Sequence, residues 1–253
     1  MDLGLSRRVV VVTGATGGIG RAVARRFAGE GARVAVAYRT GKDAATALAD
    51  ELGAADGRAM AVRHALDEAA SPAAMTGEVL DHWGRLDTLV TCAVTRGRRR
   101  APGEHFEDVP ADEWRTVLQE NLTGTLNTVS AALPAMRAAG WGRIVLLSSH
   151  IARHGLAGQE FYGAVKAGFE GLARSLAWDA GPDGVLVNAV SPGLTLTDGV
   201  LAKLPEAARE KERVQTPTGR LSTPEAVADA VLFLGSGANS NICGETLQVT
   251  GGR

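Results

Sequence analysis

The chain has 253 residues and a mass of 26.2 kDa, enough to bury one sizeable core, either as one large α/β domain or as two small ones. Its apolar content of 45%, charged content of 22% and net charge of -1 are those of a soluble globular protein, and they predict neither a nucleic-acid partner nor a membrane-surface partner. Every apolar run is far shorter than the ~20 residues of a transmembrane helix. A strand that begins at residue 9 leaves no room for a signal peptide. We therefore expect a cytoplasmic protein.

Strands and helices are predicted to alternate along the chain. Apolar runs predict strands at 8–13, 33–38, 58–64, 87–91, 144–148, 185–190 and 246–249. Helical spacing of apolar residues predicts helices at 18–29, 42–52, 72–83, 112–138, 162–180 and 223–234. Strands that are apolar throughout, each followed by a helix, are typical of a parallel sheet covered on both faces. We expect the α/β class, with a single doubly wound Rossmann domain over 1–253 and a seven-stranded parallel sheet.

Residues 13–20 read TGATGGIG and join the first predicted strand to the first helix. Glycines let backbone amides approach a pyrophosphate, and a helix N-terminus favours its negative charge. This position after the first strand favours a dinucleotide site over a turn that serves packing alone. Cofactor contacts are therefore predicted at Gly14, Thr16, Gly17, Gly18 and Ile19.

The second strand ends in Tyr38, followed by Arg39 and Thr40. A nicotinamide cofactor without a 2′-phosphate usually meets an acidic side chain at this place. Here a guanidinium can pair with a 2′-phosphate, and the Thr40 hydroxyl can add a hydrogen bond. We predict NADP(H) rather than NAD(H); the alternative is that Arg39 is merely solvated.

Tyr162 and Lys166 are four residues apart, a spacing that puts both side chains on one face of a helix. A neighbouring ammonium is expected to lower the tyrosine pKa from its usual value of about 10. Ser149 follows the predicted strand at 144–148, so it emerges at the edge of the sheet where ligands bind. The spacing of Tyr162 and Lys166 is a weak signal by itself, because it also arises by chance.

These features together resemble the short-chain dehydrogenase/reductase family. The resemblance covers the whole chain and is nearest to 3-oxoacyl carrier-protein reductases and ketoreductases of secondary metabolism. It rests on TGATGGIG at 13–20, Asn121 within ENLTG, Ser149, Tyr162 with Lys166, the Pro192-Gly193 turn with Thr197, and the C-terminal segments GRLSTPEAVADAVLFLGS and GETLQVTGG.

The resemblance implies an NADPH-dependent enzyme that reduces a small-molecule ketone. Tyr162 is expected to donate the proton, Ser149 to hydrogen-bond the carbonyl oxygen, and Lys166 to hold the ribose and lower the Tyr162 pKa. Asn121 is expected to anchor a water that relays protons to Lys166. The resemblance also implies a homotetramer or homodimer through the helices at 112–138 and 161–180, where small residues (Ala164, Ala167, Gly168 and Gly171) permit close approach. Further cofactor contacts are implied at Leu66, Ala93, Pro192, Gly193, Thr195 and Thr197.

Three departures from the family pattern bear on function. Residues 91–94 read TCAV where the family has Asn-Asn-Ala-Gly; Thr91 can still hydrogen-bond, but Val94 adds a side chain. The acidic residue that meets adenine would fall near Ala65, so adenine binding is left to the Leu66 backbone. Gly140 and Trp178 stand where carrier-protein reductases place basic side chains, which argues against a carrier-bound substrate.

The substrate pocket is predicted to involve residues 94–100, 150–161 and 194–215. Four arginines between 96 and 100 are either an anion-binding group or part of a solvated loop. His150 and His154 either include a further catalytic acid or are surface or pocket-wall residues. The charged, weakly apolar segment at 194–215 is interpreted as a mobile lid.

Two other readings of the function stay open at this point. The enzyme can run as an alcohol dehydrogenase in the oxidative direction, or the chain can be a non-catalytic NADP-binding sensor or scaffold. The two cysteines, Cys92 and Cys243, have no metal-binding spacing, so we expect reduced thiols and no metal site. Nothing in the sequence identifies the ketone.

Overall fold

The computed structural model describes residues 2–253. Its seven strands form one parallel sheet in the order β3-β2-β1-β4-β5-β6-β7, which confirms the predicted sheet. The order reverses between β1 and β4, so the loops that follow these two strands diverge and leave a crevice for a ligand. The strands are β1 (Val9–Thr13), β2 (Arg33–Tyr38), β3 (Ala59–Arg63), β4 (Thr88–Thr91), β5 (Gly142–Leu147), β6 (Val185–Pro192) and β7 (Thr246–Val249).

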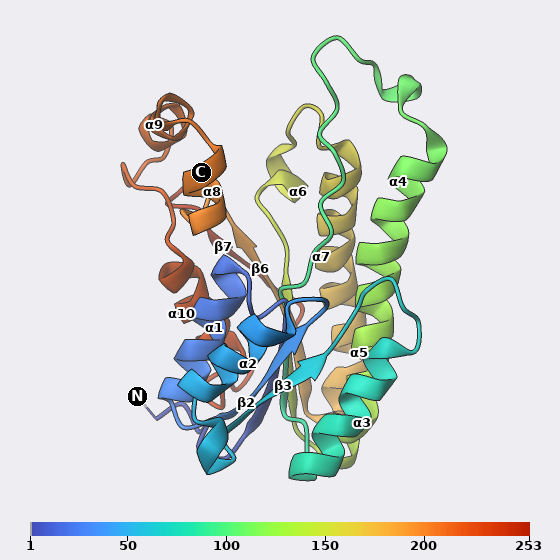
Figure 1. Cartoon of the computed structure of the whole chain (residues 1–253), viewed down its shortest axis with the longest axis vertical. Helices are drawn as coiled ribbons and strands as arrows, with labels where there is room; N and C mark the ends of the chain where they lie inside the picture. The colour runs from blue at the N-terminus through green and yellow to red at the C-terminus, as the bar shows by residue number, and fades with distance from the viewer. Residues whose placement is uncertain (1) are drawn as a thin grey trace.

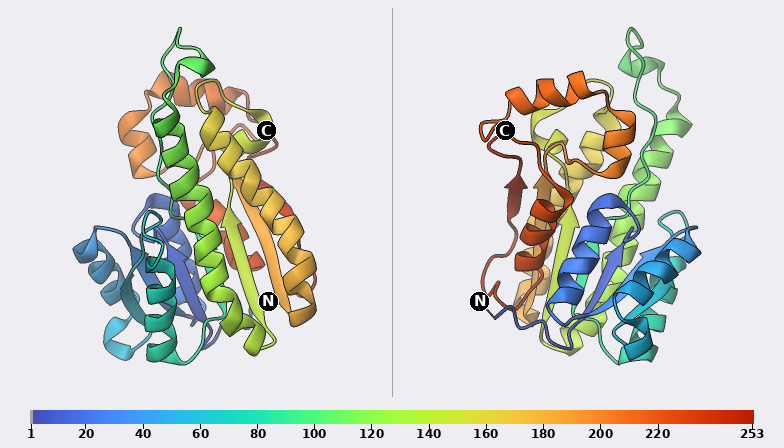
Figure 2. Two further views of the ribbon diagram at one scale, coloured as in Figure 1. Left: turned by 90° about the vertical axis from the view of Figure 1, so that its right-hand side faces the viewer. Right: turned by 60° about the vertical axis from the view of Figure 1, so that its left-hand side comes forward.

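Helices cover both faces of the sheet (Figure 1). One face carries α1 (Gly18–Gly29), α2 (Lys42–Glu51) and α10 (Pro224–Leu234). The other carries α3 (Ser71–Trp83), α4 (Ala111–Leu118), α5 (Gly124–Ala138) and α7 (Glu160–Ala180). Figure 2 shows α5 and α7 side by side on the outer surface. None of the helices within 2–253 is long and apolar enough to cross a membrane.

Two apolar cores lie on either side of the sheet because successive strand residues point to opposite faces. Val10 and Val12 of β1 pack with Phe27 of α1, while Val9 and Val11 pack with the helices of the opposite face. All five residues of β1 are buried. This explains why the strand shows no alternation of polar and apolar residues.

The prediction of one continuous helix at 112–138 is wrong. Helices α4 and α5 are separated by a π-helical turn at Gln119–Thr123. The Asn121 side chain donates to the Val117 carbonyl at 2.8 Å. In a regular α-helix that carbonyl would accept from the Asn121 backbone amide, so the side chain competes with the backbone and favours the wider turn.

Short helices lie beyond the carboxyl ends of the strands. Helix α6 (Ile151–His154) follows β5, and α8 (Asp198–Lys203) and α9 (Glu206–Val214) follow β6. In Figure 1, α8 and α9 stand on one side of this edge and the loop between β4 and α4 stands on the other. The sheet edge between them is where Ser149 and the glycine-rich turn emerge.

Candidate active site

The glycine-rich turn leads directly into the N-terminus of α1. Gly17 is the N-cap residue and provides no side-chain oxygen, so no side chain caps the first amides of the helix. Gly17 and Gly18 are exposed there, while Ile19 packs partly against the core. Amides without a cap at a helix N-terminus suit a phosphate group, and the site therefore fits a dinucleotide.

Close backbone contacts explain the glycines of the turn. Gly14 has a φ of 61°, and a Cβ there would lie 2.8 Å from the Ala93 backbone. A Cβ on Gly20 would collide with the Gly14 carbonyl oxygen, and one on Gly18 would lie 2.6 Å from the Thr197 side chain. The turn thus touches the segment after β4 and the segment after β6, two of the segments predicted to bind the cofactor.

The end of β2 leaves both predicted phosphate-binding side chains accessible. Tyr38 is partly buried, whereas Arg39 and Thr40 are exposed beyond it. No ion pair within residues 2–253 includes the Arg39 guanidinium. Thr16 lies in the turn, where its carbonyl accepts from Arg21 at 3.3 Å.

The remaining predicted cofactor contacts are held mainly by backbone hydrogen bonds. Ala93 donates its amide to Thr13 Oγ1 at 3.1 Å, and the Pro192 carbonyl accepts from the His150 amide at 2.9 Å. The Leu66 carbonyl faces α5, where a Cβ on Gly124 would lie 2.5 Å from its oxygen. Past β6, Gly193 pairs with Val249, Thr195 is buried beside Ser222, and Thr197 caps α8 through its side chain.

The structure brings Ser149, Tyr162 and Lys166 together. Ser149 follows β5, where its Oγ accepts from the Ile151 amide at 3.3 Å, and its side chain lies close enough to the Tyr162 hydroxyl to affect the pKa of that group. Lys166 is buried on α7, with its Nζ 5.5 Å from the centre of the Tyr162 ring. The ammonium donates to the Leu147 carbonyl at 2.6 Å, which anchors it to the end of β5. The neighbouring Ser148 fixes α7 further by donating to the Lys166 carbonyl at 3.0 Å.

Burial changes the acid–base properties of both titratable groups. Loss of water lowers the pKa of Lys166 to about 7. Burial raises the pKa of the Tyr162 hydroxyl, against smaller opposing effects of the Arg96 charge and the Ser149 hydrogen bond. The predicted lowering of the Tyr162 pKa is therefore wrong for this structure, because burial outweighs the charges around the ring. Near neutral pH the hydroxyl keeps its proton.

Asn121 lies buried in the π-helical turn, and its side chain bonds to the backbone of Thr95 and Val117. Its Oδ1 accepts from the Thr95 amide and its Nδ2 donates to the Thr95 carbonyl, each at 2.8 Å. Together with the bond to Val117, these contacts occupy the whole side-chain amide apart from one lone pair. The side chain fixes the loop after β4; the predicted water relay stays a prediction.

The segment at 91–94 differs from the sequence expectation in one respect. The Thr91 hydroxyl is buried without a hydrogen-bond partner, so the predicted hydrogen bond is not formed. Both cysteines are free, and burial raises the pKa of the Cys92 thiol to about 12 against the influence of Lys166. Val94 is 36% exposed and does not fill the core.

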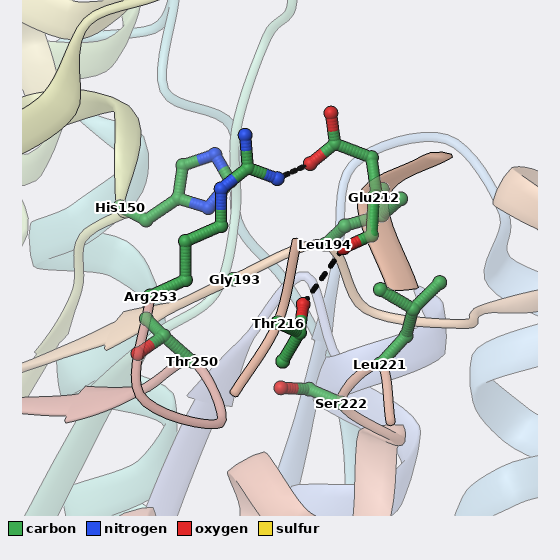
Figure 3. A pocket seen from close by; sticks show the side chains of 9 residues that line it. All are labelled: His150, Gly193, Leu194, Glu212, Thr216, Leu221, Ser222, Thr250 and Arg253. Carbon is green, nitrogen blue, oxygen red and sulfur yellow. Dashed lines mark hydrogen bonds and ion pairs between the residues drawn. The ribbon is translucent and has the colours of Figure 1, made fainter. Parts of the chain in front are cut away.

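The histidines next to Ser149 have different surroundings. His154 is exposed, whereas His150 lies beside Gly193 and the Arg253 side chain, lining a pocket shown in Figure 3. Its Nδ1 is buried without a partner, and burial lowers its pKa. Arg253 also forms an ion pair with Glu212 of α9. Sequence reasoning missed Arg253, because no local signal shows that the chain end returns to this site.

Comparison with known proteins agrees with this arrangement. Residues 14–253 match the sequence model of a family described as enoyl-(acyl carrier protein) reductase. The chain is 38% identical over 254 residues to the 3-oxoacyl-[acyl-carrier-protein] reductase FabG of Aquifex aeolicus, covering all of this chain and 99% of that protein. The chain belongs to the short-chain dehydrogenase/reductase family. It is an oxidoreductase of the nicotinamide-dependent type.

Other relatives of this oxidoreductase carry different names. It is 40% identical to the cis-4-hydroxycyclohexanecarboxylate dehydrogenase of Sinomonas cyclohexanicum, covering all of this chain and 98% of that protein. It is 36% identical to the short-chain reductase protein NovJ of Streptomyces niveus, covering 97% and 93%. A solved structure described as ribose-5-phosphate isomerase from Brucella melitensis 16M has a TM-score of 0.88 at 33% identity, covering 100% and 94%. The fold is thus shared among proteins with different names.

Proposed function

We propose that this enzyme is an NADP-dependent ketone reductase in which Tyr162 donates the proton. The observation that carries the proposal is the meeting of the Ser149 and Tyr162 side chains at the end of β5, with buried Lys166 beside them. The glycine-rich turn lies close to this group, because Gly14 abuts Ala93 and the neighbouring Cys92 lies within electrostatic reach of Lys166.

Each side chain has a distinct role in the proposed reaction. When bound, the reduced nicotinamide supplies a hydride to the carbonyl carbon. Tyr162 gives its proton to the carbonyl oxygen, and Ser149 donates a hydrogen bond that places the same oxygen. A tyrosine that stays protonated near neutral pH suits a general acid. One Lys166 N–H is bonded to Leu147, and the two others are left for the ribose hydroxyls.

The preference for NADP(H) rests on Arg39 and Thr40. Both are exposed at the end of β2, and Arg39 has no acidic partner within residues 2–253 to neutralise its charge. The test compares kcat/KM for NADPH and NADH in the wild type, in Arg39→Ala and in Arg33→Ala as a control for charge. Arg39→Ala is expected to lose about tenfold or more with NADPH alone, as for a charged hydrogen bond. A wild-type preference for NADH would overturn the assignment.

The reaction direction has one competing candidate. The relative from Sinomonas is named a dehydrogenase, which supports oxidation of an alcohol by the same residues. Initial rates in both directions with matched alcohol and ketone pairs, including 4-oxocyclohexanecarboxylate, distinguish the two candidates. Cofactor binding without turnover of any compound would instead favour a sensor or scaffold. A carrier-bound substrate is not part of the proposal, because Gly140 and the exposed Trp178 provide no basic side chain.

We also propose a homotetramer, with a homodimer as its smaller form, built on the outer face of α5 and α7. Ala164 and Ala167 are exposed on α7, and Trp178 is 88% exposed on the same helix. Gly168 instead packs against Leu122 of the same chain. The mass in solution tests the proposal, and a monomer would overturn it. A lid formed by α8 and α9, and a cytoplasmic location, stay predictions.

A further inference from the structure

The four arginines between residues 96 and 100 divide into two groups. Three of them are bonded to the protein itself. Arg98 pairs with Glu104 at 2.5 Å and with Glu113 at 2.6 Å. Arg99 donates to the Ala157 carbonyl at 3.2 Å and 3.3 Å, and Arg100 pairs with Glu160 at 2.7 Å. Acidic side chains neutralise Arg98 and Arg100, and the Ala157 carbonyl holds Arg99 in place.

Arg96 differs from the other three. Its side chain is exposed and takes part in no hydrogen bond or ion pair of residues 2–253. Arg96 and Arg99 both lack an acidic partner within the described residues, but only Arg96 also has no hydrogen bond to the protein. Guanidinium groups bind carboxylates through two parallel hydrogen bonds, so a free one suits an anionic ligand.

The residues on both sides of Arg96 are fixed against α4 and the π-helical turn. Asn121 holds the Thr95 backbone through two hydrogen bonds of 2.8 Å. Gly97 packs so tightly on Val117 that any Cβ at residue 97 would collide with that side chain. Asn121 and Val117 are one helical turn apart, so the backbone of Arg96 is held between two anchors. Such a residue presents its charge from a defined position.

Arg96 lies at the same edge of the sheet as Ser149 and Tyr162, because its loop follows β4, the neighbour of β5, and Ala93 of that loop abuts Gly14 of the glycine-rich turn. Burial dominates the pKa of both Tyr162 and Lys166, and the Arg96 charge is a smaller effect on each, which agrees with this placement. Lys166 is buried and Tyr162 is half-buried, whereas Arg96 is exposed, so Arg96 stands on the solvent side of this group. An anion bound at Arg96 would accordingly stand close to the carbonyl that Tyr162 protonates.

We infer that Arg96 selects the substrate by binding a carboxylate carried by the ketone, so that this enzyme acts on keto acids. The inference rests on the proposed function, because it concerns the substrate class of the same site. Arg96 is a specificity residue and takes no part in the proton transfer.

The test compares a keto acid with its neutral ester. Suitable probes are 4-oxocyclohexanecarboxylate and its methyl ester, which have the same ketone and ring. The wild type is expected to prefer the acid. Arg96→Ala is expected to lower kcat/KM for the acid about tenfold or more, mainly through KM, and to leave the ester unchanged. Arg96→Lys keeps the charge but loses the paired hydrogen bonds, so it is expected to retain part of the preference.

Arg99→Ala is the matched control, because it removes the same charge from the same loop. It is expected to keep the wild-type ratio of acid to ester. An unchanged ratio in Arg96→Ala, an equal loss in Arg99→Ala, or a wild-type preference for the ester would each overturn the inference. Turnover of the ester with NADPH supports the proposed function in every one of these cases. Turnover of neither probe and of no other ketone would overturn the proposed function and this inference with it.

Discussion

The Asn121 side chain forms two hydrogen bonds with the backbone of Thr95. It accepts from the Thr95 amide and donates to the Thr95 carbonyl, each at 2.8 Å. The same side chain donates a hydrogen bond to the Val117 carbonyl, which favours the π-helical turn between α4 and α5. One buried amide thus links the bend in the helix to the loop that carries Arg96. This link gives Asn121 a positioning role that is separate from any proton relay.

Asn121→Ala is expected to destabilise the fold by about 2 kcal/mol, because buried polar groups of Thr95 and Val117 lose their partner. Chemical denaturation measures the change, and hydrogen exchange at the Thr95 amide reports the loosened loop. Asn127→Ala is the control, since Asn127 makes no side-chain hydrogen bond among the described residues. Equal stability of the two variants would contradict the positioning role.

Two glycines of α1, Gly20 and Gly29, differ in the space around them, so substituting each by alanine tests the effect of close packing apart from that of helix propensity. Gly20→Ala is expected to be destabilising and to weaken NADPH binding, because its Cβ would collide with the Gly14 carbonyl oxygen. Gly29→Ala places its Cβ in open space and is expected to be neutral or to stabilise by up to about 1 kcal/mol. Thermal melting and nucleotide titration of both variants make the comparison. Tight NADPH binding by Gly20→Ala at wild-type stability would refute it.

Thr91 and Thr88 lie on the same strand, and both are buried. The Thr91 hydroxyl has no partner, whereas Thr88 donates to the Gly235 carbonyl at 2.9 Å. Thr91→Val is expected to raise the free energy of unfolding by about 1 kcal/mol, since an unpaired hydroxyl is replaced by a methyl group. Thr88→Val is expected to lower it by about 1 kcal/mol. Chemical denaturation decides the point, and a loss of stability in Thr91→Val would show that its hydroxyl is bonded in solution.

The free energy of unfolding is expected to depend on pH, because the buried side chain of His64 has a lowered pKa. Burial lowers its pKa to about 4, and its Nε2 lies 2.8 Å from Thr128 Oγ1, which itself donates to the Gly124 carbonyl. Nε2 is therefore the donor, and the ring is neutral. The unfolded chain, with an ordinary histidine pKa of about 6.5, binds the proton more readily, so stability falls as pH drops from about 6.5 to 4, by about 3 kcal/mol in total.

His64→Gln is expected to flatten this part of the stability curve, because glutamine can hydrogen-bond Thr128 but does not titrate. His154→Gln changes an exposed residue and is the control. Denaturation midpoints between pH 4 and pH 7 measure the effect. The same slope in the wild type and in His64→Gln would assign the pH dependence to other groups.

The sequence alone was enough to predict the sheet and the proximity of Ser149, Tyr162 and Lys166. Buried parallel strands such as Val9–Thr13 leave a continuous apolar run, and Ser149 and Tyr162 are each tied to a recognisable element. The π-helical turn at Asn121 was not predictable. It depends on the Asn121 side chain, and not its backbone amide, donating a hydrogen bond to the Val117 carbonyl.

The division of the arginine run was equally hidden in the sequence. Arg98 and Arg100 are neutralised by Glu113 and Glu160, which the fold brings from other segments. The pKa of Tyr162 depends in the same way on three-dimensional surroundings, since burial outweighs the charges around it. Local spacing thus predicted which residues gather at the site, while their electrostatic state required the folded chain.

The most direct test of the account is the turnover of Tyr162→Phe. Rates of NADPH oxidation are measured for the wild type and the variant with a ketone that the wild type reduces, together with NADPH affinity by fluorescence. Loss of the general acid is expected to lower kcat about 10²–10⁴-fold, while NADPH affinity is retained. Near-normal turnover by Tyr162→Phe would contradict the assignment of Tyr162 as the proton donor.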